Sequence, residues 1–221
     1  MTIFKASENQ QFLAPFGPTI GYYKMPNNLV DTLNQSIHKN LEDNSERLVG
    51  KVSQELRFDS ETKKVAADGL LNFIIDYHQY TKSRNSMGKV GLDRTKQYNL
   101  DITNAWFVRQ FENEYNPLHV HSGCTLSSVG YLSLPDGIED EWEEDYKDHY
   151  PANGHINFSY GTDGLYTCSN FLVKPQVGDF YIFPSYLFHC VYPFYTKGER
   201  RSFSMNMIFN TVWFINSILI K

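Results

Sequence analysis

The chain has 221 residues, a formal net charge of −5 and 15% aromatic residues. This length predicts a single domain over residues 1–221, with helical support over about residues 1–100 and a β-rich core over about residues 101–210. The negative charge excludes generic coating of nucleic acid or of an anionic membrane surface. The longest apolar stretch, residues 208–220, is interrupted by Asn210 and Asn216 and is too short to predict a transmembrane helix.

The N-terminal residues and the cysteines indicate the compartment. No charged start followed by an apolar run opens the sequence, so we expect no secretory signal. The cysteines are odd in number and lack the spacing of a metal knuckle, which favours reduced thiols over disulfides. They are Cys124, Cys168 and Cys190. We therefore expect a cytoplasmic protein, in the host cytoplasm if a phage encodes it.

The first hundred residues contain two segments with helical character. One follows Pro26, and its apolar side chains recur every four residues at Leu29, Leu33, Ile37 and Leu41. The second starts with Ser60 as its N-cap and carries Leu70, Leu71, Ile74, Ile75 and Tyr77, although Gly69 in its interior is unfavourable for a helix. We expect both helices to pack against the rest of the domain.

After about residue 100 the segments are short and rich in β-branched and aromatic residues. Glycine and proline separate them, so that each segment has a turn at its end. We predict six strands, at residues 105–111, 125–134, 155–158, 171–174, 179–183 and 200–209. The predicted fold class is mainly β with N-terminal helices (α+β), the helices being packed on an antiparallel β-barrel.

Three histidines form a candidate metal site. His119 and His121 are two residues apart, so on an extended chain both imidazoles point to one face and can reach one ion. His189 stands in an aromatic stretch, which indicates that it is at least partly buried. Two nearby ligands and a third from a distant strand would give a metal site with open coordination positions, as oxygen-activating iron requires.

Taken singly, each histidine has a simpler interpretation. A lone histidine in an aromatic strand is more often a buried structural residue than a ligand. His38 and His78 lie on the expected helices without clustered partners, and we expect them at the surface. His149 and His155 follow an acidic stretch, and we predict no role for them.

Arg200 is the candidate anion-binding residue. It shares a polar strand face with Ser202, whereas Arg201 points to the opposite, mostly apolar face. If the apolar face packs outward, Arg200 points into the barrel, where a buried guanidinium needs an anion. A ligand carboxylate, held by Arg200 with help from Ser202, would supply it. The alternative is a salt bridge to one of the chain's own acids.

The order of these residues resembles that of the 2-oxoglutarate and Fe(II)-dependent oxygenases, and more narrowly a branch found in phages and marine bacteria. The resemblance covers about residues 100–210. It rests on His119-x-His121, the strand 126–132, Gly154-x-Ile156-x-Phe158, the run 178–189 that ends in His189, and Glu199-Arg200-x-Ser202. It implies a double-stranded β-helix core, a jelly-roll and cupin-like fold, with iron near its open end.

The family pattern implies roles for individual residues. His119 and His189 match its iron-binding histidines. Arg200, assisted by Ser202, matches the residue that binds the distal carboxylate of 2-oxoglutarate. Two further positions at which relatives contact this co-substrate, and which packing would also explain, are Gln110 and Tyr131.

His121 departs from the family pattern, which has Asp or Glu at this position. A neutral ligand there leaves the site with one more positive charge. Because the narrower branch tolerates His-x-His, the resemblance keeps His121 as a metal ligand. The alternatives are a water molecule or halide at that coordination position, or an acid from elsewhere in the fold.

Two segments outside this pattern have open roles. The acidic stretch 136–145 is typical of a solvated loop; alternatively, it forms a lid with Trp142 against the substrate and favours a basic substrate. The apolar residues 217–220 predict docking onto the domain or onto a second copy in a homodimer.

The resemblance implies an enzyme that uses Fe(II), O₂ and 2-oxoglutarate, with ascorbate as a candidate reductant. It would hydroxylate a C–H bond and release succinate and CO₂. An amino-acid side chain of a peptide or protein, prolyl among them, is favoured as second substrate over a small metabolite or modified nucleobase. Two alternatives are a catalytically silent metal- or ligand-binding β-barrel, and a three-histidine cupin-type dioxygenase that does not use 2-oxoglutarate.

Overall fold

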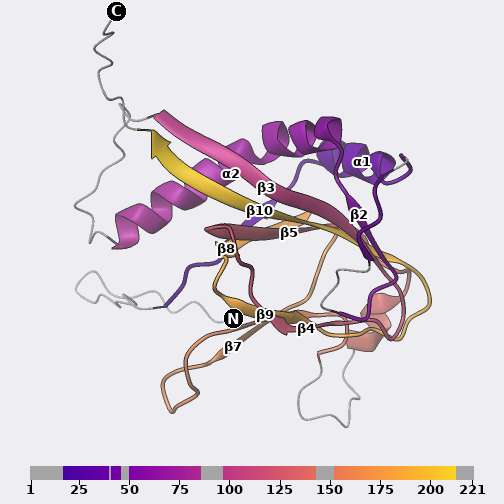
Figure 1. The fold of residues 1–221 in the computed structure, drawn as a ribbon. Coiled ribbons are helices and arrows are strands. Elements are labelled where there is room, and N and C mark those ends of the chain that lie inside the picture. Colours follow the sequence, from indigo (N-terminus) through magenta and orange to yellow (C-terminus); the bar gives the residue numbers. More distant parts are fainter. Residues whose placement is uncertain (1–16, 40, 46–49, 86–96, 143–151, 213–221) are drawn as a thin grey trace, which may run out of the picture.

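Two antiparallel sheets and two long helices make up the fold in the computed structural model, which describes residues 17–39, 41–45, 50–85, 97–142 and 152–212 (Figure 1). One sheet has six strands in the order β1-β8-β5-β10-β3-β2, and the other has four in the order β4-β9-β6-β7. The strands are β1 Gly21–Lys24, β2 Gln54–Arg57, β3 Gln97–Gln110, β4 Asn116–His119, β5 Leu126–Ser133, β6 Ile156–Ser159, β7 Asn170–Val173, β8 Asp179–Pro184, β9 Phe188–Val191 and β10 Arg200–Val212. This architecture confirms the predicted double-stranded β-helix with N-terminal helices.

The helices α1 (Asn27–Ser36) and α2 (Ser60–Asn85) lie on one side of the six-stranded sheet, and the four-stranded sheet lies on its other side (Figure 1). The side chains of β10 point alternately toward the helices and toward the four-stranded sheet. Phe203, Met205 and Met207 are fully buried in the core that also contains helix residues such as Leu33. Because side chains alternate along a strand, the residues between them face the four-stranded sheet.

The ends of both helices differ from the prediction. α1 ends at Ser36, so Leu41 packs against the core from the chain beyond the helix. The cap of α2 is Asp59 and not Ser60, because the Thr62 N–H donates to Asp59 Oδ1 at 2.7 Å.

Gly69 in the interior of α2 has a packing reason. A Cβ at this position would lie 2.8 Å from both δ-carbons of Leu29 on α1. The missing side chain therefore lets the two helices approach closely.

Four short strands were not predicted. β1 and β2 come from the N-terminal part of the chain and form the two edges of the six-stranded sheet, paired with β8 and β3. β4 and β9 pair with each other and carry two of the three candidate histidines. Each of the four has only four residues, which is too short for alternation of apolar and polar residues to be recognised.

The remaining expectations concern the surroundings of the domain. Of the helices in the described residues, none has the length and apolar character that crossing a membrane requires. Cys124, Cys168 and Cys190 are free. Residues 217–220, His149 and the end of the acidic stretch lie outside the described residues.

Candidate metal and co-substrate site

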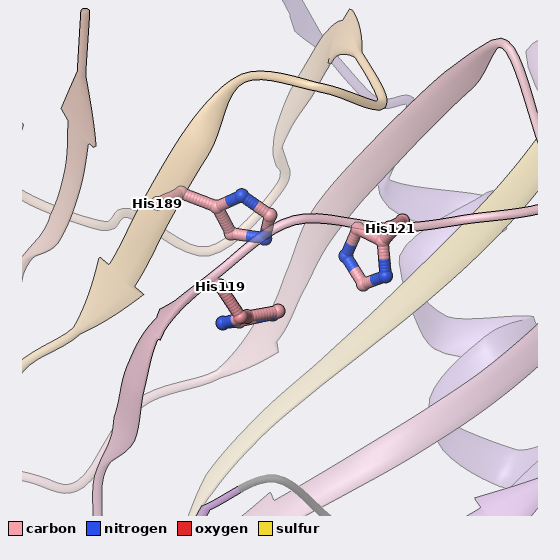
Figure 2. Close-up of side chains that lie close together, drawn as sticks. All are labelled: His119, His121 and His189. Carbon is pink, nitrogen blue, oxygen red and sulfur yellow. The ribbon is translucent and has the colours of Figure 1, made fainter.

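Pairing of β4 with β9 brings two of the histidines together. His119 lies directly opposite His189, so both imidazoles project from the same face of the small sheet. The next residues continue toward β5, and the His121 N–H donates to the Ser185 carbonyl at 2.9 Å. The ligand nitrogens of the three histidines all lie within 4.8 Å of one another (Figure 2). The predicted set of histidines is therefore one cluster in the folded chain.

Backbone carbonyls orient two of the three rings. His119 Nδ1 lies 2.7 Å from the Pro117 carbonyl oxygen, and His189 Nδ1 lies 2.9 Å from that of Leu187. A carbonyl oxygen only accepts hydrogen bonds, so each Nδ1 carries a proton and Nε2 is the nitrogen left to bind a metal. Histidines that bind metals typically have such a partner behind the ring.

Burial keeps two of the three imidazoles, those of His121 and His189, neutral. It lowers the pKa of His189 to about 3 and that of His121 to about 4, and the neighbouring His119 acts in the same direction. Aromatic rings contribute to this burial, since the Phe183 ring lies edge-on to His189 with centroids 4.9 Å apart. At neutral pH both imidazoles can therefore offer a lone pair to a cation.

The donor set of the cluster consists of imidazoles alone. Among the described residues, no aspartate, glutamate or cysteine belongs to the group of mutually close ligand atoms. His121 Nδ1 lies 3.5 Å from the Asn206 amide, which is too long for a strong hydrogen bond. Three imidazole nitrogens fit Fe(II), and three ligands leave coordination positions open.

Arg200 is buried without an anionic partner. Its side chain is only 1% exposed, and one nitrogen donates to the Gly154 carbonyl at 2.6 Å while another donates to Gln110 Oε1. The remaining Nε–H is buried and has no hydrogen-bond partner. No ion pair joins this guanidinium to an acidic side chain of the described residues, and burial lowers its pKa from the ordinary value. A buried arginine without a counter-ion fits a site for a ligand carboxylate.

The neighbouring arginine is paired and lies on the other face of β10. Arg201 Nε lies 2.9 Å from Glu199, which also binds Arg109. The salt-bridge alternative therefore describes Arg201 and not Arg200.

Two hydroxyl side chains accompany Arg200 inside the sheets. Ser202 is buried on the same face and lies opposite Tyr131 of β5. The Tyr131 hydroxyl is buried without a hydrogen-bond partner. Burial raises the pKa of Tyr131 to about 12, although the Arg200 charge acts the other way. A neutral hydroxyl donor beside an unpaired guanidinium fits recognition of a carboxylate such as that of 2-oxoglutarate.

The three histidines open into a cavity of about 490 Å³ between the sheets. Val129 and Ser204 line it, and the next residues on the same strand faces are Tyr131 and Ser202. The histidine cluster and Arg200 thus face the same interior between the sheets. The cavity is also lined by Glu55, Arg57 and Trp106 and by three asparagines: Asn44, Asn104 and Asn116.

Glu55 is the site residue that the sequence analysis missed. It lies on β2, with Leu56 of the same strand buried in the core behind the sheet. Burial raises the pKa of Glu55 to about 7, with a hydrogen bond from Trp106 opposing and the charge of Asp43 adding to the rise. The sequence signal for this strand is weak, because only Leu56 among its four residues is apolar.

Glu55→Gln is expected to stabilise the fold increasingly as the pH rises from 5 to 8. A folded-state pKa of about 7 lies above the unfolded value of about 4.3, so ionising the buried carboxylate costs folding free energy as pH rises through this window. The carboxylate is partly solvated, and we expect a gain of about 1–2 kcal/mol at pH 8. Urea unfolding of the wild type and of Glu55→Gln at pH 5 and pH 8 measures the difference in unfolding free energy. An equal difference at pH 5 and pH 8 would contradict this assignment.

Trp142 and His155, which the sequence analysis also considered, lie away from the cavity. Trp142 belongs to a short 3₁₀ helix, Ile138–Trp142, and its indole donates to the Asn153 carbonyl at 2.9 Å. It does not line the histidine cavity, so the lid interpretation has no support in its position. His155, for which no role was predicted, is buried beside Trp142 with ring centroids 5.7 Å apart.

The predicted surface histidines differ from each other. His38 is exposed at the end of α1, as expected. His78 is half-buried on α2, and burial lowers its pKa to about 4, so the surface prediction is wrong for this residue.

Comparisons with solved structures find proteins that are similar to this chain. HygX from Streptomyces hygroscopicus, solved with nickel and 2-oxoglutarate bound, matches with a TM-score of 0.50 and 12% identity over 86% of this chain and 83% of that chain. A prolyl hydroxylase from Trichoplax adhaerens, in complex with a hypoxia inducible factor peptide fragment, matches with a TM-score of 0.49 and 12% identity over 85% and 83% of the two chains. A Pseudomonas putida prolyl-4-hydroxylase matches with a TM-score of 0.47 and 16% identity over 86% and 93%.

The family comparison agrees with the motifs. Residues 104–206 match the family described as "Putative 2OG-Fe(II) oxygenase", and the three histidines and Arg200 lie inside the matched segment. Comparison with curated proteins gives no match. Fe(II) and 2-oxoglutarate are the cofactor and co-substrate of this family, as the motifs predicted. The match confirms the resemblance: residues 104–206 are similar to the 2-oxoglutarate and Fe(II)-dependent oxygenases.

Proposed function

We propose that this chain is a Fe(II)- and 2-oxoglutarate-dependent oxygenase that hydroxylates a C–H bond. In this reaction one atom of O₂ enters the new C–OH group and the other enters succinate, while 2-oxoglutarate loses CO₂. The observation that carries the proposal is the buried, unpaired Arg200 facing the same interior as three clustered histidines. Each feature alone has a structural explanation, and together they match the two requirements of this chemistry.

The histidines are proposed to hold the metal. His119 and His189 would bind through the Nε2 atoms that their carbonyl contacts leave available, and His121 would supply the third nitrogen. Bound Fe(II) would supply the activation of O₂. The protein's own part is to leave coordination positions open and to keep apolar rings around the site, which excludes water.

Arg200 is proposed to bind the distal carboxylate of 2-oxoglutarate. The unpartnered Nε–H and the Tyr131 hydroxyl are the donors, and Ser202 adds a second hydroxyl on the same face. Gln110 acts through Arg200, since its amide oxygen accepts from the guanidinium and fixes its orientation. It is therefore a positioning residue in this proposal.

The second substrate is proposed to be an amino-acid side chain, with a prolyl side chain as one candidate. A small metabolite or a nucleobase is the other class that a cavity of about 490 Å³ accepts. Specificity then depends on the other residues that line the cavity.

Oxygen consumption separates this proposal from its two alternatives. We expect the protein to consume O₂ above the rate of a protein-free control with Fe(II) and ascorbate only when 2-oxoglutarate is present. Consumption that is independent of 2-oxoglutarate would favour a three-histidine dioxygenase, for which Arg200 has no use. No consumption by protein that binds Fe(II) would favour a silent metal-binding barrel.

A further inference from the structure

A carboxylate and an indole form one unit in the wall of the cavity. Glu55 and Trp106 both line the cavity that contains the three histidines, and the Trp106 N–H donates to the Glu55 carboxylate. The Trp106 ring lies 6.0 Å from that of His121 between centroids. Trp106 thus contacts the Glu55 carboxylate and lies beside His121.

The backbone holds Glu55 in place. Its N–H donates to Ser45 Oγ at 3.0 Å, and its carbonyl accepts from the Asn44 N–H at 2.9 Å. The side chain therefore projects from a fixed position of β2 into the cavity.

No cation neutralises this carboxylate within the described residues. The charge that acts on it is that of Asp43, which is also negative. Arg57 lies on the same face of β2, but its side chain is half exposed and pairs with Glu42 at 3.6 Å. The inner wall around Glu55 is therefore a negative, partly desolvated position that a cationic group would stabilise.

From this arrangement we infer that Glu55 and Trp106 bind a protonated amine of the second substrate, and that this substrate is an amine-bearing aliphatic side chain of the lysine type. The inference rests on the proposed function and names its substrate class. The carboxylate pairs with the ammonium, while the indole supplies apolar surface and its negative face to the chain that carries the amine. Methylene groups between the amine and the substrate backbone would then lie toward the histidines, where a C–H bond is to be hydroxylated.

Calorimetric titration tests the inference without relying on turnover. The protein is loaded with Mn(II) and 2-oxoglutarate and titrated with Nα-acetyl-lysine amide and, in parallel, with Nα-acetyl-norleucine amide, which lacks the charge. We expect the lysine derivative to bind at least about tenfold more tightly, as one charge-assisted hydrogen bond implies. Free L-lysine is a third ligand that distinguishes a free amino acid from a peptide-borne side chain.

Two variants test whether Glu55 causes the preference for the lysine derivative. Glu55→Gln should remove the preference for the lysine derivative, whereas Asp68→Asn, which deletes an exposed charge paired with Lys64 on α2, should retain it. A thermal melt of Glu55→Gln checks that the variant is folded. Equal binding of both derivatives by the wild type, no binding of either, or equal loss in both variants would overturn the inference. Failure of the wild type to bind Mn(II) and 2-oxoglutarate in the loading step would instead contradict the proposed function.

Discussion

Replacing His189 by alanine is expected to lower the affinity for Fe(II) at least about 100-fold, since loss of a ligand should cost no less than the 10- to 100-fold typical of an outer-shell partner. The ring is nearly fully buried, and its Nδ1 contact with the Leu187 carbonyl aims Nε2 at the cluster. Two histidines then remain, which is too few to hold the ion against water. Anaerobic titration with Fe(II), followed by calorimetry, measures the change.

The matched control is His38→Ala, which removes an exposed histidine at the end of α1 and should leave the affinity unchanged. Unaltered affinity in His189→Ala protein with a normal thermal melt would show that the cluster is structural and does not bind the metal.

His121→Asp tests the departure from the family pattern. Aspartate restores the charged ligand that relatives have, and its short side chain starts from the same backbone position, which the hydrogen bond to Ser185 fixes. We expect this variant to bind Fe(II) at least as tightly as the wild type, because a carboxylate adds a negative charge beside the cation. Unchanged affinity in both His121→Ala and His121→Asp would place the position outside the metal site.

Arg200→Ala is expected to weaken binding of 2-oxoglutarate by tens to thousands of fold, which corresponds to about 2–5 kcal/mol for a desolvated charge-assisted pair. The guanidinium is the buried cation on this face of β10, and its Nε–H lacks a partner without a ligand. Arg200→Lys retains the charge but loses the fork geometry, so it should bind with intermediate affinity. Calorimetric titration of the metal-loaded protein with 2-oxoglutarate measures the series.

Arg201→Ala is the control for this series. Arg201 pairs with Glu199 on the opposite face of β10. When Arg201 is replaced, Glu199 keeps its ion pair with Arg109. We expect the affinity for 2-oxoglutarate to change less than twofold. A larger loss in Arg201→Ala than in Arg200→Ala would mean that the two arginines have exchanged faces, a register shift of one residue.

The sequence predicted the long elements because their patterns repeat several times. The alternation from Arg200 to Met207 settles which face of β10 is polar, and the heavy burial of Phe203 on the other face follows from the same rule. The helices were found by their apolar spacing. Their ends were missed because capping depends on one hydrogen bond, such as that from the Thr62 N–H to Asp59.

The short strands and the wall of the cavity could not be predicted in this way. β4 and β9 have four residues each, and what unites them is the pairing of His119 with His189, seventy residues apart in sequence. Glu55 reaches the cavity only because β2 adds to the edge of the sheet next to β3. Such placements depend on tertiary pairing, and a single four-residue segment carries too little pattern to specify it.

The most direct test of the central claim is the conversion of labelled 2-oxoglutarate to succinate by the purified protein with Fe(II), O₂ and ascorbate. We predict succinate formation well above the level of the His189→Ala protein, even without a second substrate, and a further increase with a lysine-containing peptide. Succinate at no more than the His189→Ala level, with and without candidate peptides, from wild-type protein that is folded and binds Fe(II), would contradict the oxygenase assignment.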